Sequence, residues 1–217
     1  MKNNIDMTDL NNRLEMFFLN PKEIHAKYRE KYQQLYDIKH IKKYGIRFSP
    51  LYLLREDIFF CLGKSLGKKK IKFNFGPANF AGVILINTAI NNIVNKLFNK
   101  DFVKFGTEYL EINEEWKINK IWHLRNTLIH NNYGLSYRCD KCSSKIYFKL
   151  DTNLKDLIKI DKKWQRNYPS ELYIINPKRL HEIFENALKK VEKEINNNKK
   201  LQKIFMNNIR LKDWLIL

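Results

Sequence analysis

Residues 79–100 read NFAGVILINTAINNIVNKLFNK and form the most apolar of the helices that the sequence predicts. Aliphatic residues recur there at intervals of three and four, which is typical of a helix with one buried face. We expect that face to consist of Val83, Ile86, Ile90, Ile93, Val94 and Leu97. Asn87, Asn91 and Asn95 share another face, which is either solvated or turned toward a cleft or a partner subunit.

A second amphipathic helix is predicted over residues 107–130. Its apolar side consists of Leu110, Trp116, Ile121, Leu124 and Leu128. The segment begins with acidic residues and ends with basic ones, which suits the dipole of a helix. Asn131, Asn132 and Gly134 end it. These two long helices are the centre of the predicted fold.

The rest of the chain is also mainly helical by pattern, and glycine (7) and proline (5) are scarce. Thr8 is read as the cap of the first helix, and Ser49-Pro50 and Pro177 open two others. Besides the two central helices, the predicted helices are 8–18, 23–43, 49–61, 180–196 and 201–217. Between them, three short strands are expected, at 135–137, 146–150 and 172–175. The sequence therefore predicts a helical bundle with a small β-insertion.

The net charge of +18 points to a polyanionic partner, although an AT-rich genome could raise the lysine content by codon bias alone. The first residues, 1–19, are polar and show no export signal. The longest apolar stretch, Phe80–Ile90, is too short to span a bilayer. Three cysteines do not make a disulfide framework. We therefore expect a cytoplasmic protein without a membrane partner.

Residues 121–134, IWHLRNTLIHNNYG, hold the candidate catalytic residues Arg125, Asn126 and His130. Histidine carries protons near neutral pH, and arginine offers a permanent planar cation for a charged phosphoryl group. Asn126 could orient His130 or bond a phosphate oxygen. A purely structural role is the alternative, in which Arg125 and His130 pair with glutamates or cap the helix.

This segment resembles the signature of HEPN ribonucleases, in which an arginine, a polar residue and then a histidine stand near the end of a helix. The resemblance implies an all-α, HEPN-like helical bundle with a small β-hairpin insertion. Residues 76–217 would be the HEPN-like domain, with the insertion at about 134–176. Residues 1–75 would be an N-terminal helical segment packing on it.

The resemblance also implies a metal-independent endoribonuclease that needs no cofactor and leaves a 2′,3′-cyclic phosphate and a 5′-hydroxyl. It would act as a homodimer with its symmetry axis close to Arg125 and His130, as a toxin or antiviral-defence effector. An antitoxin or regulatory protein is a candidate partner. In the antitoxin-regulated branch a tyrosine follows the histidine after one residue. Here Asn132 occupies that position, so modification of a tyrosine is not carried over.

Two other functions remain open. One is a non-catalytic helical adaptor that binds nucleic acid through basic residues and stacks bases on Trp122, Tyr133 or Tyr137. The other is a regulatory dimer that senses a small nucleotide. The lysine-rich loop at 64–72 is either an RNA contact or a solvated surface loop.

Cys139 and Cys142 form a CxxC pair between two predicted strands, like half of a zinc ribbon. Zinc takes four ligands in structural sites, and the chain has no second CxxC. A dimer could join two such pairs into one structural zinc site. The alternative is a reduced pair or an incidental turn.

Overall fold

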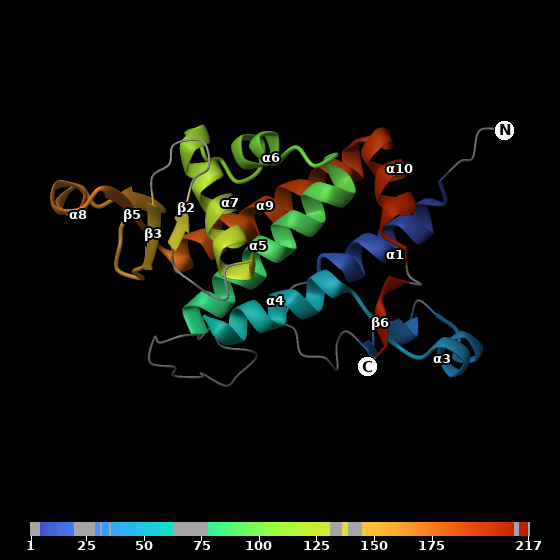
Figure 1. Cartoon of the computed structure of the whole chain (residues 1–217). Helices are drawn as coiled ribbons and strands as arrows, with labels where there is room; N and C mark the ends of the chain where they lie inside the picture. Colours follow the sequence, from blue (N-terminus) through green and yellow to red (C-terminus); the bar gives the residue numbers. More distant parts are fainter. Residues whose placement is uncertain are drawn as a thin grey trace.

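The computed structural model describes residues 5–19, 29–30, 32–34, 36–62, 78–130, 136–138, 145–210 and 213–216. Its helices are α1 (Met7–Phe17), α3 (Ile38–Tyr44), α4 (Pro50–Cys61), α5 (Ala78–Leu97), α6 (Phe102–Glu108), α7 (Glu115–His130), α8 (Lys162–Asn167), α9 (Pro177–Asn197) and α10 (Lys199–Asn208). Its strands are β1 (Arg47–Phe48), β2 (Ser136–Arg138), β3 (Lys145–Leu150), β4 (Ile158–Ile160), β5 (Ser170–Ile175) and β6 (Leu215–Ile216). The expected mainly helical architecture with a small β-region is confirmed (Figure 1).

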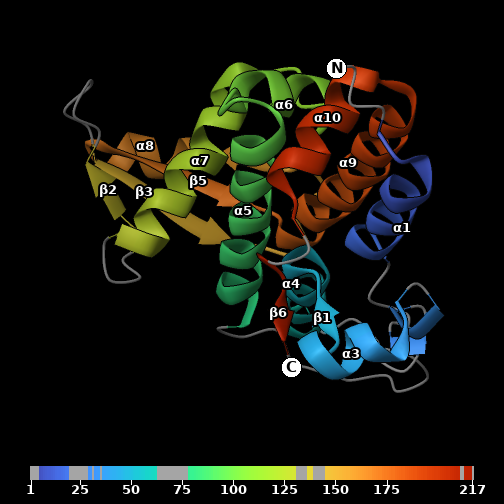
Figure 2. The same ribbon diagram turned by 90° about the vertical axis from the view of Figure 1, so that its right-hand side faces the viewer.

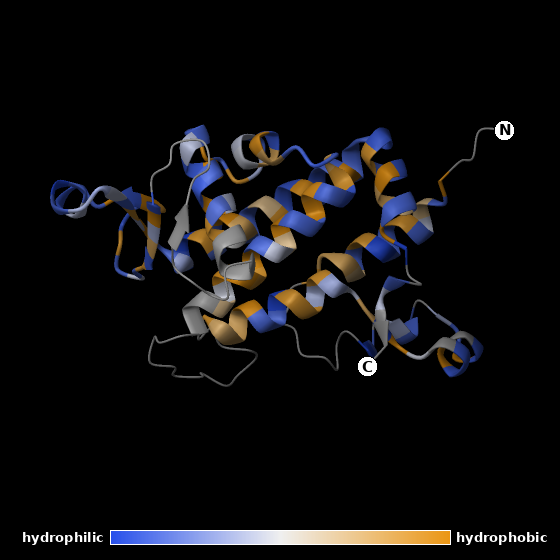
Figure 3. Ribbon diagram, viewed as in Figure 1, coloured by the Kyte–Doolittle hydropathy of each residue, from blue (hydrophilic) through white to orange (hydrophobic). Residues whose placement is uncertain are grey.

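Helix α5 is the centre of the bundle and contacts α4, α7, α9 and α10. Figure 2 shows it between α7 on one side and α9 and α10 on the other. The predicted apolar face is buried at all six positions: Val83, Ile86, Ile90, Ile93, Val94 and Leu97. Hydrophobic residues are concentrated on α4 and α5, hydrophobic and hydrophilic residues alternate along α9, and α8 is hydrophilic (Figure 3). Of the two alternatives for the asparagine face, solvation does not hold at Asn87, which is buried and donates to the Val83 carbonyl.

Two of the bundle helices begin as the sequence predicts. The Ser49 hydroxyl accepts from the Tyr52 backbone N–H, and Pro50 is the first residue of α4. Pro177 likewise opens α9, and the side chain of Asn176 caps it by accepting from two backbone N–H groups. A proline loses nothing in the first turn, because its missing N–H would have no partner there.

The insertion forms a four-stranded sheet in the order β2-β3-β5-β4, together with helix α8. Strands β3 and β5 are parallel, and the two outer pairings are antiparallel. One face carries buried apolar residues that join the core of the bundle: Ile146, Phe148, Ile158, Tyr173 and Ile175. The β-region is therefore larger than the expected hairpin, because β4 and α8 were not predicted.

The predicted helix over residues 107–130 is wrong in its first third. The chain forms α6 first, leaves the helix at Tyr109 and enters α7 at Glu115. Glu111 has a φ of 54°, in the left-handed region, and the Ile112 N–H returns to the Gly106 carbonyl at 3.0 Å. The reversal lays α6 across α7.

Two other predicted helices are also shorter than expected. In the range 23–43, residues 36 and 37 are not helical, and α3 starts at Ile38. The tail is helical only to Asn208, and Leu215–Ile216 instead pairs antiparallel with Arg47–Phe48. The pairing brings the C-terminal strand β6 beside β1, at the end of the bundle that also holds α3 (Figure 2).

Candidate functional site

Helix α7 carries the three predicted catalytic residues. Its backbone is helical without interruption from Glu115 to His130, so Arg125, Asn126 and His130 all lie within its last two turns. Their side chains lie outside the described part of the structure. What the structure provides is therefore the position of the motif: one continuous helix that packs on α5 and α6 in the bundle.

The middle of α7 is held by close packing. Ile118, Ile121 and Leu124 are buried in the core. Gly106 of α6 lies so near α7 that a Cβ built on it would stand 2.6 Å from the Ile118 side chain. The rings of Phe102 and Trp122 are 4.1 Å apart. Trp122, one of the residues expected to stack on bases, is thus engaged with α6.

The start of α7 is fixed to the sheet. The Lys120 ammonium is 3.6 Å from the Glu171 carboxylate and 4.6 Å from the centre of the Tyr173 ring. Lys117 forms an ion pair with Glu114. Hydrogen bonds from Lys117 and from the Trp116 indole hold the pKa of the Glu114 carboxyl below its usual value. Packing and charge therefore both orient the helix that carries the motif.

Helix geometry separates the two key positions of the motif. A helix turns about 100° per residue, so positions 125 and 130 are about 140° apart around its axis. When the buried stripe of Ile118, Ile121 and Leu124 is continued at that angle, position 125 falls within the arc of the stripe and position 130 on the opposite side of the helix. A single copy of α7 therefore does not bring both positions to one point.

Other histidines are weaker candidates for catalysis than His130. His181 on α9 is only 1% exposed, its Nε2 is 3.7 Å from the Glu185 carboxylate, and its ring meets Phe59 edge-on. A substrate from solvent does not reach it, and we assign it a structural role. His25 and the side chain of His40 lie outside the described residues.

Arg55 on α4 shares the carboxylate beside His181. Its Nε and Nη2 donate to the two oxygens of Glu185 on α9, at 3.1 and 2.6 Å. Its Nη1 donates to the carbonyls of Phe18 and Leu19, at 2.8 Å each. The guanidinium thus joins the end of α1 to α4 and α9, which makes this buried cluster a structural feature.

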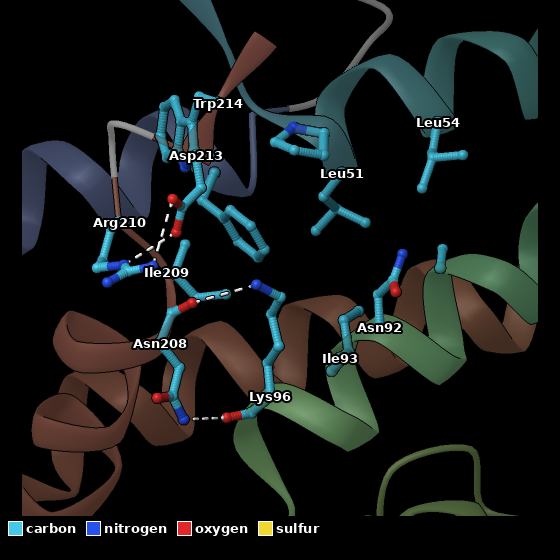
Figure 4. Close-up of a pocket in the computed structure, with 13 residues that line it drawn as sticks. Leu51, Leu54, Asn92, Ile93, Lys96, Asn208, Ile209, Arg210, Asp213 and Trp214 are labelled. Atoms are coloured by element: carbon cyan, nitrogen blue, oxygen red, sulfur yellow. Dashed lines mark hydrogen bonds and ion pairs between the residues drawn. The ribbon is translucent and has the colours of Figure 1, made fainter.

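A largely apolar pocket of about 130 Å³ opens between α4, α5 and the C-terminal tail (Figure 4). The Lys96 ammonium at its rim donates to the Asn208 carbonyl at 3.3 Å, and Arg210 is paired with Asp213 at 2.9 Å. Among the described residues of its wall there is no histidine, cysteine or serine. Its ionisable side chains are Lys96, Arg210 and Asp213, and the last two are paired with each other.

Metal binding has little support in what the structure describes. Cys139 and Cys142 lie outside the described residues, as does the loop at 64–72. Cys61 is a free, half-buried thiol, and burial raises its pKa. The described ranges hold no cluster of three or more His, Cys, Asp or Glu side chains that could bind a metal ion.

One group of candidate binding residues was not predicted from the sequence. Tyr147, Trp164 and Tyr168 form a chain of ring contacts on the far side of the sheet. The sequence pattern that could have indicated this group is the alternation of Lys145, Tyr147 and Lys149, which places three side chains on one face of a strand. Of the other aromatic residues considered for stacking, Tyr133 and the side chain of Tyr137 lie outside the described part.

No protein family, curated protein or solved structure was found to match this chain. Within the described ranges, no helix has the length and apolar character needed to cross a membrane. The position of the motif and the surfaces around it are therefore the basis for a functional proposal.

Proposed function

We propose that the chain is a HEPN-type endoribonuclease that cleaves RNA without a metal ion and acts as a homodimer. The observation that carries the proposal is the unbroken helix α7, which contains Arg125, Asn126 and His130 in its last two turns and packs on the central helix α5.

The proposed reaction uses the ribose 2′-hydroxyl as the nucleophile. The bond from the 2′-oxygen to phosphorus forms and the bond from phosphorus to the 5′-oxygen breaks. His130 takes the 2′-hydroxyl proton, and His130 of the partner subunit gives a proton to the leaving 5′-oxygen. Arg125 stabilises the charge on the phosphoryl oxygens, and Asn126 orients His130 or bonds one of those oxygens. The products are a 2′,3′-cyclic phosphate and a 5′-hydroxyl.

The same geometry supports the proposed dimer. Because positions 125 and 130 point about 140° apart on one helix, one subunit aligns them poorly for a single phosphate. A twofold axis near the end of α7 would place two copies of the motif across one cleft. The proposed biological role is that of a cytoplasmic toxin or antiviral-defence effector, restrained by an antitoxin or regulatory protein.

Purified wild type, Arg125→Ala and His130→Ala, each incubated with a labelled RNA in EDTA, test the proposal. We expect each variant to lose at least about 100-fold in cleavage rate, because general acid–base catalysis by His130 and charge stabilisation by Arg125 each contribute that much or more. Arg179→Ala, which removes an exposed arginine from α9, is the matched control and should cleave like the wild type. Mass spectrometry of the product ends should detect the cyclic phosphate.

Undiminished cleavage by Arg125→Ala and His130→Ala, or no cleavage by clean wild type, contradicts the ribonuclease. The second candidate, a non-catalytic nucleic-acid-binding adaptor, is favoured by the net charge of +18. It predicts that RNA still binds while none is cleaved.

A structural zinc ion held between the Cys139 and Cys142 pairs of two subunits is a separate proposal. Two thiolates from each subunit would complete a tetrahedral site. Metal analysis of the purified dimer should then find about one zinc per dimer, and less than about half a zinc rules out the shared site.

A further inference from the structure

The sheet has one apolar face and one basic face. Strand register places Lys145 and Lys149 of β3 and Lys159 of β4 on the face opposite to the buried residues, and all three are exposed. The other described residues at outer positions of β3, β4 and β5 are Tyr147, Ser170, Leu172 and Ile174. None of these described positions has an acidic side chain.

Aromatic rings lie among these cations. Helix α8 packs on the outer face, where the Trp164 indole donates to the Ser170 hydroxyl at 2.9 Å. The Trp164 ring is 5.5 Å from Tyr147 and 4.4 Å from Tyr168. Tyr168 is 53% exposed, which is unusual for a side chain of this size. Figure 1 shows α8 at the outer end of the molecule, with the sheet between it and the bundle.

We name these residues the basic aromatic surface: Lys145, Tyr147, Lys149, Lys159, Trp164 and Tyr168. Helix α8 adds further exposed cations, Lys162, Lys163 and Arg166. Asp161 precedes them and accepts hydrogen bonds from the backbone N–H groups of Lys163 and Trp164, so it caps the helix. The charge of the surface therefore favours an anionic ligand, and its rings favour a ligand with flat apolar faces.

We infer that the basic aromatic surface binds single-stranded RNA. Lysines spaced along a sheet meet successive phosphates, and an exposed ring stacks on an unpaired base. A duplex hides the faces of its bases, so it would gain only the phosphate contacts. The inference that this surface holds the RNA cleaved by α7 rests on the ribonuclease function proposed above. Binding of RNA to the surface does not itself require cleavage.

The chain places the surface close to the motif. Only the segment 131–135 lies between His130 at the end of α7 and Ser136 at the start of β2, which pairs with β3. Six residue steps span at most about 20 Å even when fully extended. Because α7 packs on the apolar face, an RNA strand on the basic face would pass the β2 edge of the sheet to reach the end of α7.

Fluorescence anisotropy with a labelled single-stranded RNA, and with a duplex of the same sequence, tests the inference. Tyr168→Ala should weaken single-strand binding about five- to tenfold or more, because it removes a stacking ring. Tyr168→Phe should bind like the wild type, since it keeps the ring. Phe60→Ala removes another ring that is half exposed, on α4, and is the matched control. It should leave binding unchanged.

A separate variant tests the lysines of the basic aromatic surface. Lys149→Ala combined with Lys159→Ala should lower the slope of log affinity against log salt by about 1.4, at about 0.7 for each lost phosphate contact. Lys193→Ala combined with Lys200→Ala removes the same charge from exposed positions on α9 and α10. That control should leave the slope unchanged. Circular dichroism confirms that each variant is folded.

Equal affinity for single strand and duplex, or wild-type binding by both Tyr168→Ala and the lysine variant, overturns the inference. The ribonuclease proposal fails in a different way. Arg125→Ala and His130→Ala should abolish cleavage and keep single-strand binding, whereas the surface variants should weaken binding. A wild type that binds through the surface and does not cleave removes the ribonuclease and leaves the surface in place.

Discussion

The guanidinium of Arg55 meets one carboxylate and two peptide carbonyls in the interior. Removing one partner of such a cluster leaves the others buried without compensation. We expect Arg55→Met to lower the free energy of unfolding by roughly 3–5 kcal/mol, measured by urea denaturation. Arg179→Met breaks the exposed pair with Glu182 and should cost less than about 1 kcal/mol. Equal losses in the two variants would contradict a special role for Arg55.

Glu192 on α9 gives the fold a dependence on pH. Burial raises the pKa of its carboxyl above the ordinary value of 4.5, although Arg55 acts in the opposite direction. The folded state then keeps this proton to a higher pH than the unfolded state does. The free energy of unfolding therefore falls as pH rises through the interval above 4.5.

Glu192→Gln removes this dependence, because glutamine is never charged. Urea denaturation at about pH 4 and about pH 7.5 should show the variant gaining stability relative to wild type only at the higher pH. A difference between the two proteins that is the same at both pH values would show that burial of the charge is not the cause.

At the scale of elements, the contact between α6 and α7 depends on Gly106. A methyl group there would stand 2.6–2.8 Å from three carbons of Ile118, which is itself buried and cannot move aside. Gly106→Ala should therefore cost about 1–3 kcal/mol of folding stability, as overpacking does. Because α7 carries the motif, the variant should also lower RNA cleavage.

Ile118→Val removes the carbon nearest to the added methyl group and serves as the partner variant. In the double variant the loss should be smaller than the sum of the two single losses, since the clash is relieved. Urea denaturation of the four proteins measures this coupling. If the stability losses of the two single variants are additive, the clash with Ile118 is not the cause of the loss in Gly106→Ala.

Elements with local signals could be predicted from the sequence. Ser49-Pro50 and Pro177 mark helix starts because a capping side chain and a first-turn proline both act on the adjacent turn of the helix. At the first helix the same rule chose Thr8, whereas Asp6 accepts the N-terminal backbone hydrogen bonds. The break at residues 109–114 was missed because Leu110 and Ile112 are buried and keep an apolar spacing without being helical.

Elements defined by distant partners could not be predicted in this way. Strand β6 has two residues and exists through its pairing with β1, more than 160 positions earlier in the chain. Strand β4 likewise depends on β5. For the candidate site, the sequence supplied the position of Arg125 and His130 on a helix. It did not supply the basic aromatic surface, which forms only when α8 packs on β5 and brings Trp164 to Tyr147.

At the scale of the whole molecule, one contiguous core joins both ends of the chain. Leu10 and Phe17 of α1 and Trp214 of the tail belong to the same buried cluster as the sheet residues Phe148 and Ile175. The rings of Phe17 and Trp214 are 6.4 Å apart, so the tail packs directly on the first helix. The bundle and the insertion therefore fold as one body, in which α7 links the helices to the sheet.

The proposed chemistry places a requirement on assembly. Transfer of the 2′-hydroxyl proton and protonation of the 5′-oxygen need a base and an acid, and one subunit supplies a single His130 to the cleft. We therefore expect cleavage activity per subunit to fall on dilution in step with the dimer population measured by analytical ultracentrifugation. The fall follows from mass action, because a monomer lacks half of the acid–base pair. Activity that stays constant while the protein becomes monomeric would exclude the shared site and leave Arg125 and His130 to act within one subunit.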